Sequence, residues 1–320
     1  MIAGCASGGG SSQTATHAAN APPPGPSFFV DPTNAAAKQE ALYRQTGRTQ
    51  DADAMARLAG QPTATWIFDD TDVPGRVSAL TLAASRTGKT ALLVAYWIPG
   101  RDCGQFSSGG APSDAAYKAW IEQIAGAIGT SRTWVILEPD AIPQSLGNCL
   151  PNGKAVKARY QLLDFAVTRL SALPNTSVYL DAGHADWINP VDKLVKPLRA
   201  SGIDKAAGFS LNVSNFVSTD SNVQYGNQLS QQLGGKHFVV DTSRNGNGPY
   251  TGSDGAPTWC NPPGRALGHA PTSNTGQALV DAYLWIKVPG ESDGNCRPGA
   301  PPAGVFWPEY ALGLAKGSSG

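Results

Sequence analysis

Short apolar runs alternate with longer amphipathic stretches along most of the chain. The apolar runs, each with the character of a buried strand, lie at 65–68, 91–98, 134–137, 178–180, 208–213, 238–240 and 282–286. Helical periodicity occupies the stretches between them, including 113–128 and 156–173. The first helix is predicted over 32–46, with Asp31-Pro32 as its N-cap and first turn. In the stretch 113–128 one face is apolar, and its members are Trp120, Ile121, Ile124 and Ile128.

Strand, helix and strand at this spacing are typical of βαβ units that share a parallel sheet. About seven such units predict an α/β fold in which the sheet closes, or nearly closes, into a β/α barrel of the TIM type. An open, doubly wound sheet is the alternative. No G-x-G-x-x-G follows the first run and no P-loop is present, so neither motif supports a nucleotide-binding sheet.

The first 27 residues differ from the rest, because they are a low-complexity mixture of Gly, Ser, Ala and Pro. This composition predicts a disordered leader over 1–27, followed by one folded domain over 28–320 that opens at Phe28. Residues 2–5 resemble the end of a bacterial lipoprotein signal, in which the cysteine is lipidated. The basic and apolar parts of a signal peptide are absent, so a lipid anchor at Cys5 and a chance match both remain open.

Length and composition exclude several classes of protein. The chain has 320 residues, 41% of them hydrophobic, which is enough for the core of one α/β barrel. Formal net charge is zero and only 15% of residues are charged, without a basic stripe, so a nucleic-acid partner is not expected. No apolar run approaches the roughly 20 residues of a membrane span. The 8 tryptophans suit a secreted protein that binds a stackable ligand, although tryptophan is also ordinary core material.

Four of the five cysteines lie near the loops between the predicted elements. No C-x-x-C motif is present, so a zinc site is not expected. Four cysteines allow three pairings, of which Cys103–Cys149 with Cys260–Cys296 suits the chain, and free buried thiols are the alternative. Two disulfides would indicate an extracytoplasmic, secreted or cell-surface location.

Acidic residues stand where the third apolar run ends. Pro139 stops the run, because proline cannot donate to a strand ladder, and Glu138 and Asp140 flank it. Acids at the carboxyl end of a buried parallel strand are typical of barrel active sites, whereas a solvated acidic turn is the plain alternative. Polar groups follow the other runs in the same position: Tyr96, Arg101 and Asp102; Asp181, His184 and Trp187; Ser214 and Asn215; Asp241, Ser243, Arg244 and Asn245; Trp285, Lys287, Glu291 and Asp293.

The residue types in these clusters favour one chemistry. No G-x-S-x-G elbow is present, and His184 lacks a second well-spaced ligand, so neither a serine hydrolase nor a metal or cofactor site is predicted. Aspartate and tryptophan recur instead. Carboxyl groups supply a general acid and a base, and indoles supply flat platforms for sugar rings, a combination that indicates glycoside hydrolysis.

Six motifs carry a resemblance to a known family. They are Y-W-I-P-G-R-D-C at 96–103, L-E-P-D at 137–140, D-A-G-H-A-D-W at 181–187, D-T-S-R-N-G-N-G at 241–248, W-C at 259–260 and W-I-K-V-P-G-E-S-D-G at 285–294. Together they resemble glycoside hydrolase family 6, the cellulases comprising endoglucanases and cellobiohydrolases, over roughly residues 28–315. The resemblance implies a distorted parallel β/α barrel of seven strands that hydrolyses β-1,4-glucan with inversion at the anomeric carbon.

The resemblance also implies catalytic roles. Asp140 matches the general acid, and Asp102 matches a second acid that raises the pKa of the first and helps to position the water. Asp293 matches the position often proposed as the base, and a water chain through Asp102 and Ser108 is the competing account. Tyr96 matches the residue beneath the reactive sugar, with core packing as its alternative.

An arginine is expected to keep Asp102 charged, and Arg101 and Arg244 are the candidates. For substrate binding the family pattern points to Trp66, His184, Trp187, Asn215, Trp259, Trp285, Lys287 and Glu291. Among these, Trp66 suits core packing nearly as well, since it lies within a strand-like run. Asp181 and Asp241 are expected to be structural. Trp97 departs from the family pattern and would either narrow the cleft or shift substrate preference.

The mode of cleavage rests on loop length. The segment 296–306 is short, which favours an open cleft and internal cleavage of cellulose, whereas 249–258 is moderately long and keeps a cellobiohydrolase as the alternative. Activity on a different β-glucan is also open. A catalytically silent glucan-binding protein would be expected to lack the acids, yet Asp102, Asp140 and Asp293 are all present. The protein is expected to be a monomer that needs no cofactor.

Overall fold

One parallel sheet organises the protein. The structure is a computed structural model that describes Met1 and residues 25–317. In this part seven strands lie side by side in chain order, and each pairs in parallel with the next. They are β1 (Thr65–Ile67), β2 (Ala91–Ala95), β3 (Thr133–Leu137), β4 (Thr176–Asp181), β5 (Gly208–Leu211), β6 (His237–Asp241) and β7 (Val280–Leu284). The seven predicted strands are confirmed, and the doubly wound alternative is wrong, because the strand order never reverses.

The sheet curls until its two edges approach but do not pair along their length. Among the described residues, the isolated bridge between Thr63 and Trp285 joins the edges, with the Ala64 amide donating to the Trp285 carbonyl at 3.1 Å. The Trp66 indole adds a hydrogen bond to the Ile286 carbonyl at 2.8 Å. The barrel is therefore distorted, and an open seam runs between β1 and β7.

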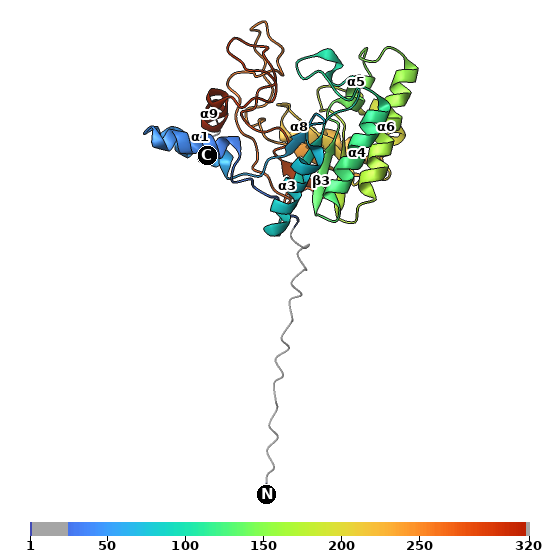
Figure 1. The fold of residues 1–320 in the computed structure, drawn as a ribbon, viewed down its shortest axis with the longest axis horizontal. Coiled ribbons are helices and arrows are strands. Elements are labelled where there is room, and N and C mark those ends of the chain that lie inside the picture. The colour runs from blue at the N-terminus through green and yellow to red at the C-terminus, as the bar shows by residue number, and fades with distance from the viewer. Residues whose placement is uncertain (2–24, 318–320) are drawn as a thin grey trace.

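Helices cover the outside of the sheet, and the loops that follow the strands gather at one end of it (Figure 1). The α-helices are α1 (Ala35–Gln45), α2 (Thr49–Ala59), α3 (Val73–Arg86), α4 (Asp114–Ile128), α5 (Ala141–Ser145), α6 (Gly153–Ser171), α7 (Val195–Ala200), α8 (Thr219–Gln232) and α9 (Pro308–Gly317). The 3₁₀ segments are η1 (Asp102–Gly104) and η2 (Val191–Leu194).

The helix limits follow from their caps. Helix α4 starts after Ser113, whose side chain accepts from the Ala116 amide, and its predicted apolar face is buried. The first helix begins three residues later than predicted, at Ala35, because Asn34 is its N-cap and accepts from the Ala37 amide at 2.8 Å. Asp31, the predicted cap, instead closes a turn by accepting from the Thr33 amide.

Alternate residues of each strand face two different cores. One side packs against the helices, where Trp120 is buried as predicted. The other side fills the barrel interior, with Phe28, Trp134 and Tyr179 in contact at the end opposite the strand-end loops. Trp134 is only half-buried there, so its predicted place in the core is confirmed in part. A third cluster joins α1, α2 and α9.

A glycine in α8 tests this packing. A Cβ on Gly226 would lie 2.4 Å from Cε2 of Phe238, a fully buried ring stacked on Phe209. We expect Gly226→Ala to lower the free energy of unfolding by about 1–3 kcal/mol, because the buried ring must move. Gly126→Ala in α4 is the matched control, since its Cβ would meet nothing within 4 Å, and it should stabilise by about 0.4–1 kcal/mol. Guanidinium unfolding curves measure both changes in the free energy of unfolding. Changes of the same sign in the two variants would contradict the close packing of Gly226 on Phe238.

Candidate active site

A cleft of about 860 Å³ opens at the carboxyl ends of the strands. The seam between β1 and β7 contributes to its wall through Thr65, Trp66 and Lys287. The cleft collects all but one of the residues predicted to act in catalysis or binding. Those that line it are Trp66, Tyr96, Asp102, Ser108, Asp140, His184, Trp187, Asn215, Trp259, Lys287, Glu291 and Asp293.

Backbone geometry turns the Asp140 side chain into the cleft. Pro139 ends β3, and both Glu138 and Asp140 adopt left-handed conformations, with φ of 49° and 69°. Asp140 occupies the N-cap position of α5, but its side chain makes no capping hydrogen bond. Its amide is held by the Asp181 carboxylate at 2.9 Å. The backbone is therefore fixed while the carboxyl group is left for other partners.

The surroundings of Asp140 favour its protonated form. Burial, and then the carboxylates of Asp181 and Asp102, raise the pKa of Asp140 well above its usual range. Burial also raises the pKa of Asp181 to about 7, against the opposing effect of hydrogen bonds from the Asp140 and Gly183 amides. Such an environment is the one that a carboxylic acid needs in order to act as a proton donor.

Asp102 is held by neutral donors. The amide and the hydroxyl of Ser107 each donate to its Oδ2 at 2.8 Å, and Gln144 donates to its Oδ1 at 3.4 Å. The same hydroxyl lies 3.2 Å from the Tyr96 hydroxyl. Sequence analysis missed Ser107, because a serine in a loop shows no pattern and the family resemblance pointed to its neighbour Ser108. Ser108 lines the cleft, and its carbonyl accepts from Arg101.

The prediction that an arginine pairs with Asp102 is wrong. Arg101 donates to the carbonyls of Phe68 and Tyr96, at 2.6 and 2.8 Å, so it fastens backbone segments. Arg244 pairs instead with Asp293 at 2.8 Å, and the side chains of the two are 0% and 6% exposed. The Asn261 amide also donates to Oδ2 of Asp293, at 3.0 Å. Oδ2 of Asp293 is therefore held by both a guanidinium group and a backbone amide.

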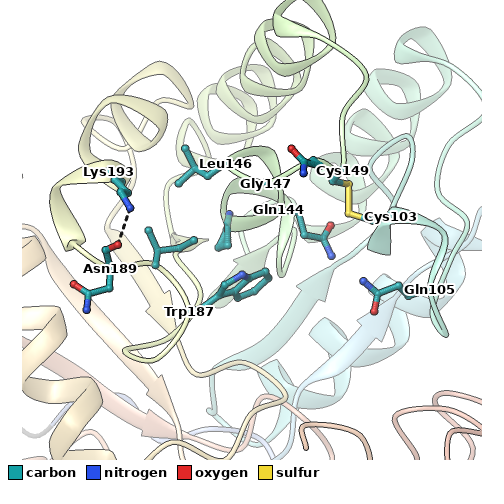
Figure 2. Close-up of a pocket in the computed structure, with 12 residues that line it drawn as sticks. Cys103, Gln105, Gln144, Leu146, Gly147, Cys149, Trp187, Asn189 and Lys193 are labelled. Atoms are coloured by element: carbon teal, nitrogen blue, oxygen red, sulfur yellow. Dashed lines mark hydrogen bonds between the residues drawn. A yellow bond between two sulfur atoms is a disulfide. The ribbon is translucent and has the colours of Figure 1, made fainter. Parts of the chain in front are cut away.

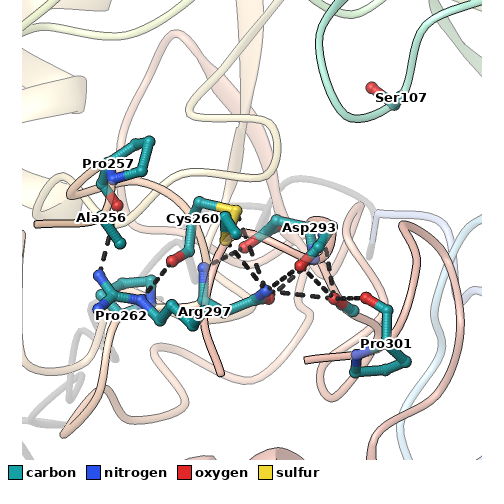
Figure 3. The surroundings of a disulfide bond; sticks show 12 residues. Ser107, Ala256, Pro257, Cys260, Pro262, Asp293, Arg297 and Pro301 are labelled. Carbon is teal, nitrogen blue, oxygen red and sulfur yellow. Dashed lines mark hydrogen bonds between the residues drawn. A yellow bond between two sulfur atoms is a disulfide. The ribbon is translucent and has the colours of Figure 1, made fainter. Parts of the chain in front are cut away.

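Two disulfides brace the loops around these acids, with the predicted pairing. Cys103–Cys149 ties the segment after Asp102 to the segment after α5, and Cys260–Cys296 ties the Trp259 loop to the loop after Asp293. Figure 3 shows the second disulfide beside Asp293 and Arg297, with Ser107 on a separate loop. Cross-links restrict the alternatives open to a loop, so both sides of the cleft are constrained.

A second cavity of about 660 Å³ adjoins the first. The two share Gln105, Gln144 and Trp187 in their walls, so they are neighbours at the Trp187 ring and are together called the groove. Figure 2 shows Trp187 between the Cys103–Cys149 disulfide and Lys193. Trp187 is 36% exposed, which leaves its indole accessible to a ligand in this groove.

The remaining tryptophans fall into two groups. Trp66 and Trp259 line the cleft, and Trp66 packs edge-on against Tyr96. The prediction of Trp285 as a stacking platform requires correction: it is 2% exposed, and its indole donates to the His269 carbonyl within the fold. Trp97 packs against Trp120 in the core between the sheet and the helices, so it is not among the residues that line the cleft.

Two phenylalanines on the cleft wall were not predicted. Phe68 ends the first apolar run, 65–68, which predicts burial, and Phe106 is an isolated aromatic residue in a loop. Phe68 and Phe106 are both exposed and line the cleft. The Phe106 ring lies 6.0 Å from that of Trp259, so the loop after Asp102 contacts the loop opposite. The cleft is therefore bridged at this point by a contact between side chains.

The other polar side chains of the cleft also contact neighbouring residues of the protein. Lys287 lies 3.7 Å from Glu291, and burial raises the pKa of Glu291. Burial lowers the pKa of His184 to about 4, which keeps the ring neutral near pH 7, 5.6 Å from the Trp187 ring. Asn215 lines the same wall, and its side-chain oxygen accepts from the Phe216 amide.

Asp241 is structural, as predicted. Its carboxylate accepts backbone hydrogen bonds from Ser214, Ser243, Ile286 and Lys287, which fixes three strand-end loops together. Within the described part of the chain, no three His, Cys, Asp or Glu side chains form a group able to hold a metal ion. No helix among residues 25–317 is long and apolar enough to cross a membrane.

Comparison with known proteins gives consistent matches. The family model of glycosyl hydrolases family 6 matches residues 24–318. Endoglucanase A of Cellulomonas fimi is 43% identical over 300 residues, which is 92% of this chain and 62% of that protein. A cellobiohydrolase C of Emericella nidulans is 31% identical over 88% of this chain and 71% of its own. The chain spans about 62% of the length of the curated relatives it matches first.

A solved structure matches over most of both chains. The endoglucanase Cel6 of Mycobacterium tuberculosis, in complex with a methyl-cellobiosyl-4-deoxy-4-thio-β-D-cellobioside, superposes with a TM-score of 0.84 at 40% identity. The superposition covers 92% of this chain and 97% of that one. The chain belongs to glycosyl hydrolases family 6.

The buried pair in the cleft wall makes a testable prediction. We expect Arg244→Met to lower the free energy of unfolding by about 3–5 kcal/mol, because it leaves the Asp293 carboxylate buried without its cation. The double variant Arg244→Met/Asp293→Asn should recover part of this loss, since no buried charge then remains. Urea unfolding at constant pH measures both. A double variant less stable than the single one would contradict the pairing.

Proposed function

We propose that the protein is an inverting endo-β-1,4-glucanase that hydrolyses internal bonds of cellulose. One observation carries the proposal: Asp140, whose pKa is raised by burial and neighbouring carboxylates, and a second carboxyl group, Asp102, share a cleft with exposed aromatic rings. Inverting glycosidases need two carboxyl groups with room for a water between them. The relatives that are 39–43% identical and named endoglucanases support the same substrate class.

In the proposed reaction Asp140 protonates the glycosidic oxygen as the bond to the anomeric carbon breaks. A water attacks the opposite face of that carbon, and its proton passes to the Asp102 carboxylate. Ser107 is hydrogen-bonded to both Asp102 and Tyr96, so it supports a relay in which Asp102 accepts the proton. Asp293 remains the competing base. Its salt bridge to Arg244 makes its carboxylate a weaker proton acceptor, which favours the relay through Asp102.

Glucan binding would use both cavities. Trp66, Trp187 and Trp259 would stack on glucose rings, while Lys287 and Glu291 would hydrogen-bond hydroxyl groups. His184, neutral at pH 7, would donate or accept a hydrogen bond without adding charge. The cavity beyond Trp187 would extend the groove for the next sugars of a long chain. Tyr96 would lie beneath the reactive ring, since it lines the cleft beside Asp102.

A cellobiohydrolase is the alternative. Internal cleavage is favoured by the short segment 296–306, which leaves little chain to roof the groove. The contact between Phe106 and Trp259 favours the alternative, because it partly covers the cleft. This cover is a contact between two side chains and is not a long loop, so an internal segment of cellulose would enter when the contact opens.

We infer an extracytoplasmic location from the two disulfides, which persist in oxidising compartments. A lipid anchor at Cys5 stays a proposal, since that residue lies outside the described residues, as does most of the leader predicted over 1–27. A single catalytic domain over 28–320 and a monomeric state are likewise proposed. Residues 25–27 already contact the domain, because the Ser27 carbonyl accepts from the Thr90 amide.

The function is tested on carboxymethylcellulose by following viscosity and reducing ends together. We expect a fast fall in viscosity with few new ends from the wild type, and a loss of about 10²–10⁴-fold in rate for Asp140→Ala. Asp186→Ala, another acid on the cleft wall, is the matched control and should retain most activity. New ends without a fall in viscosity would favour the cellobiohydrolase, and full activity of Asp140→Ala would overturn the assigned acid.

A pH profile tests the electrostatic assignment. Asp140 acts in its protonated form, so activity should fall as the pH rises through its pKa. Because the Asp181 carboxylate helps to raise that pKa, Asp181→Asn should lower it and move the alkaline limb of kcat/KM to lower pH. Asp164→Asn, which removes an exposed acid on α6, should leave the limb in place. An unmoved limb in Asp181→Asn, measured on a soluble cello-oligosaccharide, would contradict the assignment.

A further inference from the structure

Glu138 is a buried acid that the proposed reaction does not use. It is 1% exposed and lies two residues before Asp140. Its carboxylate is directed into the backbone of the neighbouring segment. Oε1 accepts from the Trp97 amide at 3.0 Å, and Oε2 accepts from the amides of Trp97 and Ile98, both at 3.1 Å.

These hydrogen bonds stand where the ladder between β2 and β3 ends. Ala95 pairs with Leu137, and the Glu138 amide donates to the Ala95 carbonyl at 2.8 Å, which is the last backbone contact of the ladder. Beyond it, β2 continues into the loop that carries Asp102, and β3 continues into Asp140. The Glu138 side chain therefore takes the place of ladder hydrogen bonds exactly where the two loops diverge.

Arg159 of α6 extends the same connection. Its guanidinium donates to the carbonyls of Pro99 and Gly100, at 3.0 and 3.1 Å, and to the Ala141 carbonyl at 3.4 Å. One side chain thus reaches the segment before Asp102 and the residue after Asp140. Glu138 accepts hydrogen bonds from the backbone N–H groups of this loop, and Arg159 donates to its carbonyl groups. Backbone donors and acceptors of the loop therefore both have side-chain partners.

We propose that Glu138 is a positioning residue that fixes the loop carrying Asp102 relative to Asp140, with Arg159 completing the connection. A residue kept only for packing would be apolar, since an apolar side chain would avoid the cost of burying a carboxylate. That cost is visible in the raised pKa of Glu138, about 7, which burial causes against the opposing hydrogen bonds from Trp97 and Ile98. An apolar side chain would leave two buried amides without acceptors.

The inference rests on the proposed function for its kinetic test. Glu138→Gln keeps the shape but turns an NH₂ group toward backbone N–H donors. We expect kcat on a soluble cello-oligosaccharide to fall about 10²-fold while KM changes less than about twofold, because misplaced catalytic groups cost rate more than binding. The loss should persist on 2,4-dinitrophenyl β-cellobioside, whose leaving group needs no proton, since the displaced group is Asp102. The loss in Asp140→Ala should largely disappear on that substrate.

Asp241→Asn is the matched control. Asp241 is equally buried and also accepts backbone hydrogen bonds, but from the loops that carry Asn215 and Lys287. We expect this control to raise KM more than it lowers kcat. Arg159→Lys is the second variant, to be used if Glu138→Gln does not fold. This variant keeps the charge but loses the planar guanidinium group that joins the Pro99 and Gly100 carbonyls to the Ala141 carbonyl. Its kcat should fall less than that of Glu138→Gln, at unchanged KM.

Amide hydrogen exchange supplies a readout that does not depend on activity. Peptides covering 97–102 should exchange faster in Glu138→Gln than in the wild type, while those covering 241–247 should not change. Unchanged exchange at 97–102, an unchanged kcat, or a rise in KM alone would each overturn the inference. A wild type without activity on any β-1,4-glucan would instead overturn the proposed function, and the exchange comparison would still decide the role of Glu138.

Discussion

The open seam between β1 and β7 is the constraint on which the rest of the structure depends. A closed barrel would fill its mouth with side chains from every strand, whereas here one bridge and one indole hydrogen bond join the edges. The opening contributes to the wall of the cleft at the ends of the strands. The loops on either side of the cleft are held by two disulfides, by the buried ion pair of Arg244 and Asp293, and by buried carboxylates that accept backbone hydrogen bonds.

Buried carboxyl groups in this protein divide into two kinds by their hydrogen-bond donors. Asp181, Asp241 and Glu138 each accept from backbone amides and serve as fixed acceptors between loops. Asp140 is different, since its side chain makes no capping bond, and its negative neighbours favour the protonated form. The same residue type thus holds the backbone at one position and is available to a substrate at another, and the difference lies in the amides around it.

The fold could be predicted from the sequence because apolar runs and amphipathic stretches report burial directly, as the seven strands and α4 show. The site could be predicted where a motif fixed a residue next to a strand end, as at Asp140 or His184. Trp285 was misplaced because a motif gives the position of a residue but not the side of the backbone it faces. Ser107, Phe68 and Phe106 were missed because the sequence does not show which side chains near a strand end turn toward the cleft.

The place where the folded chain begins has a geometric consequence. Phe28 bridges to Thr90 and packs on Trp134, which lies at the start of β3 and therefore at the end of the barrel opposite the cleft. Any attachment made upstream of residue 25 would therefore pull on the closed end of the molecule. The cleft would then face away from the point of attachment, so a tether there would not cover its entrance.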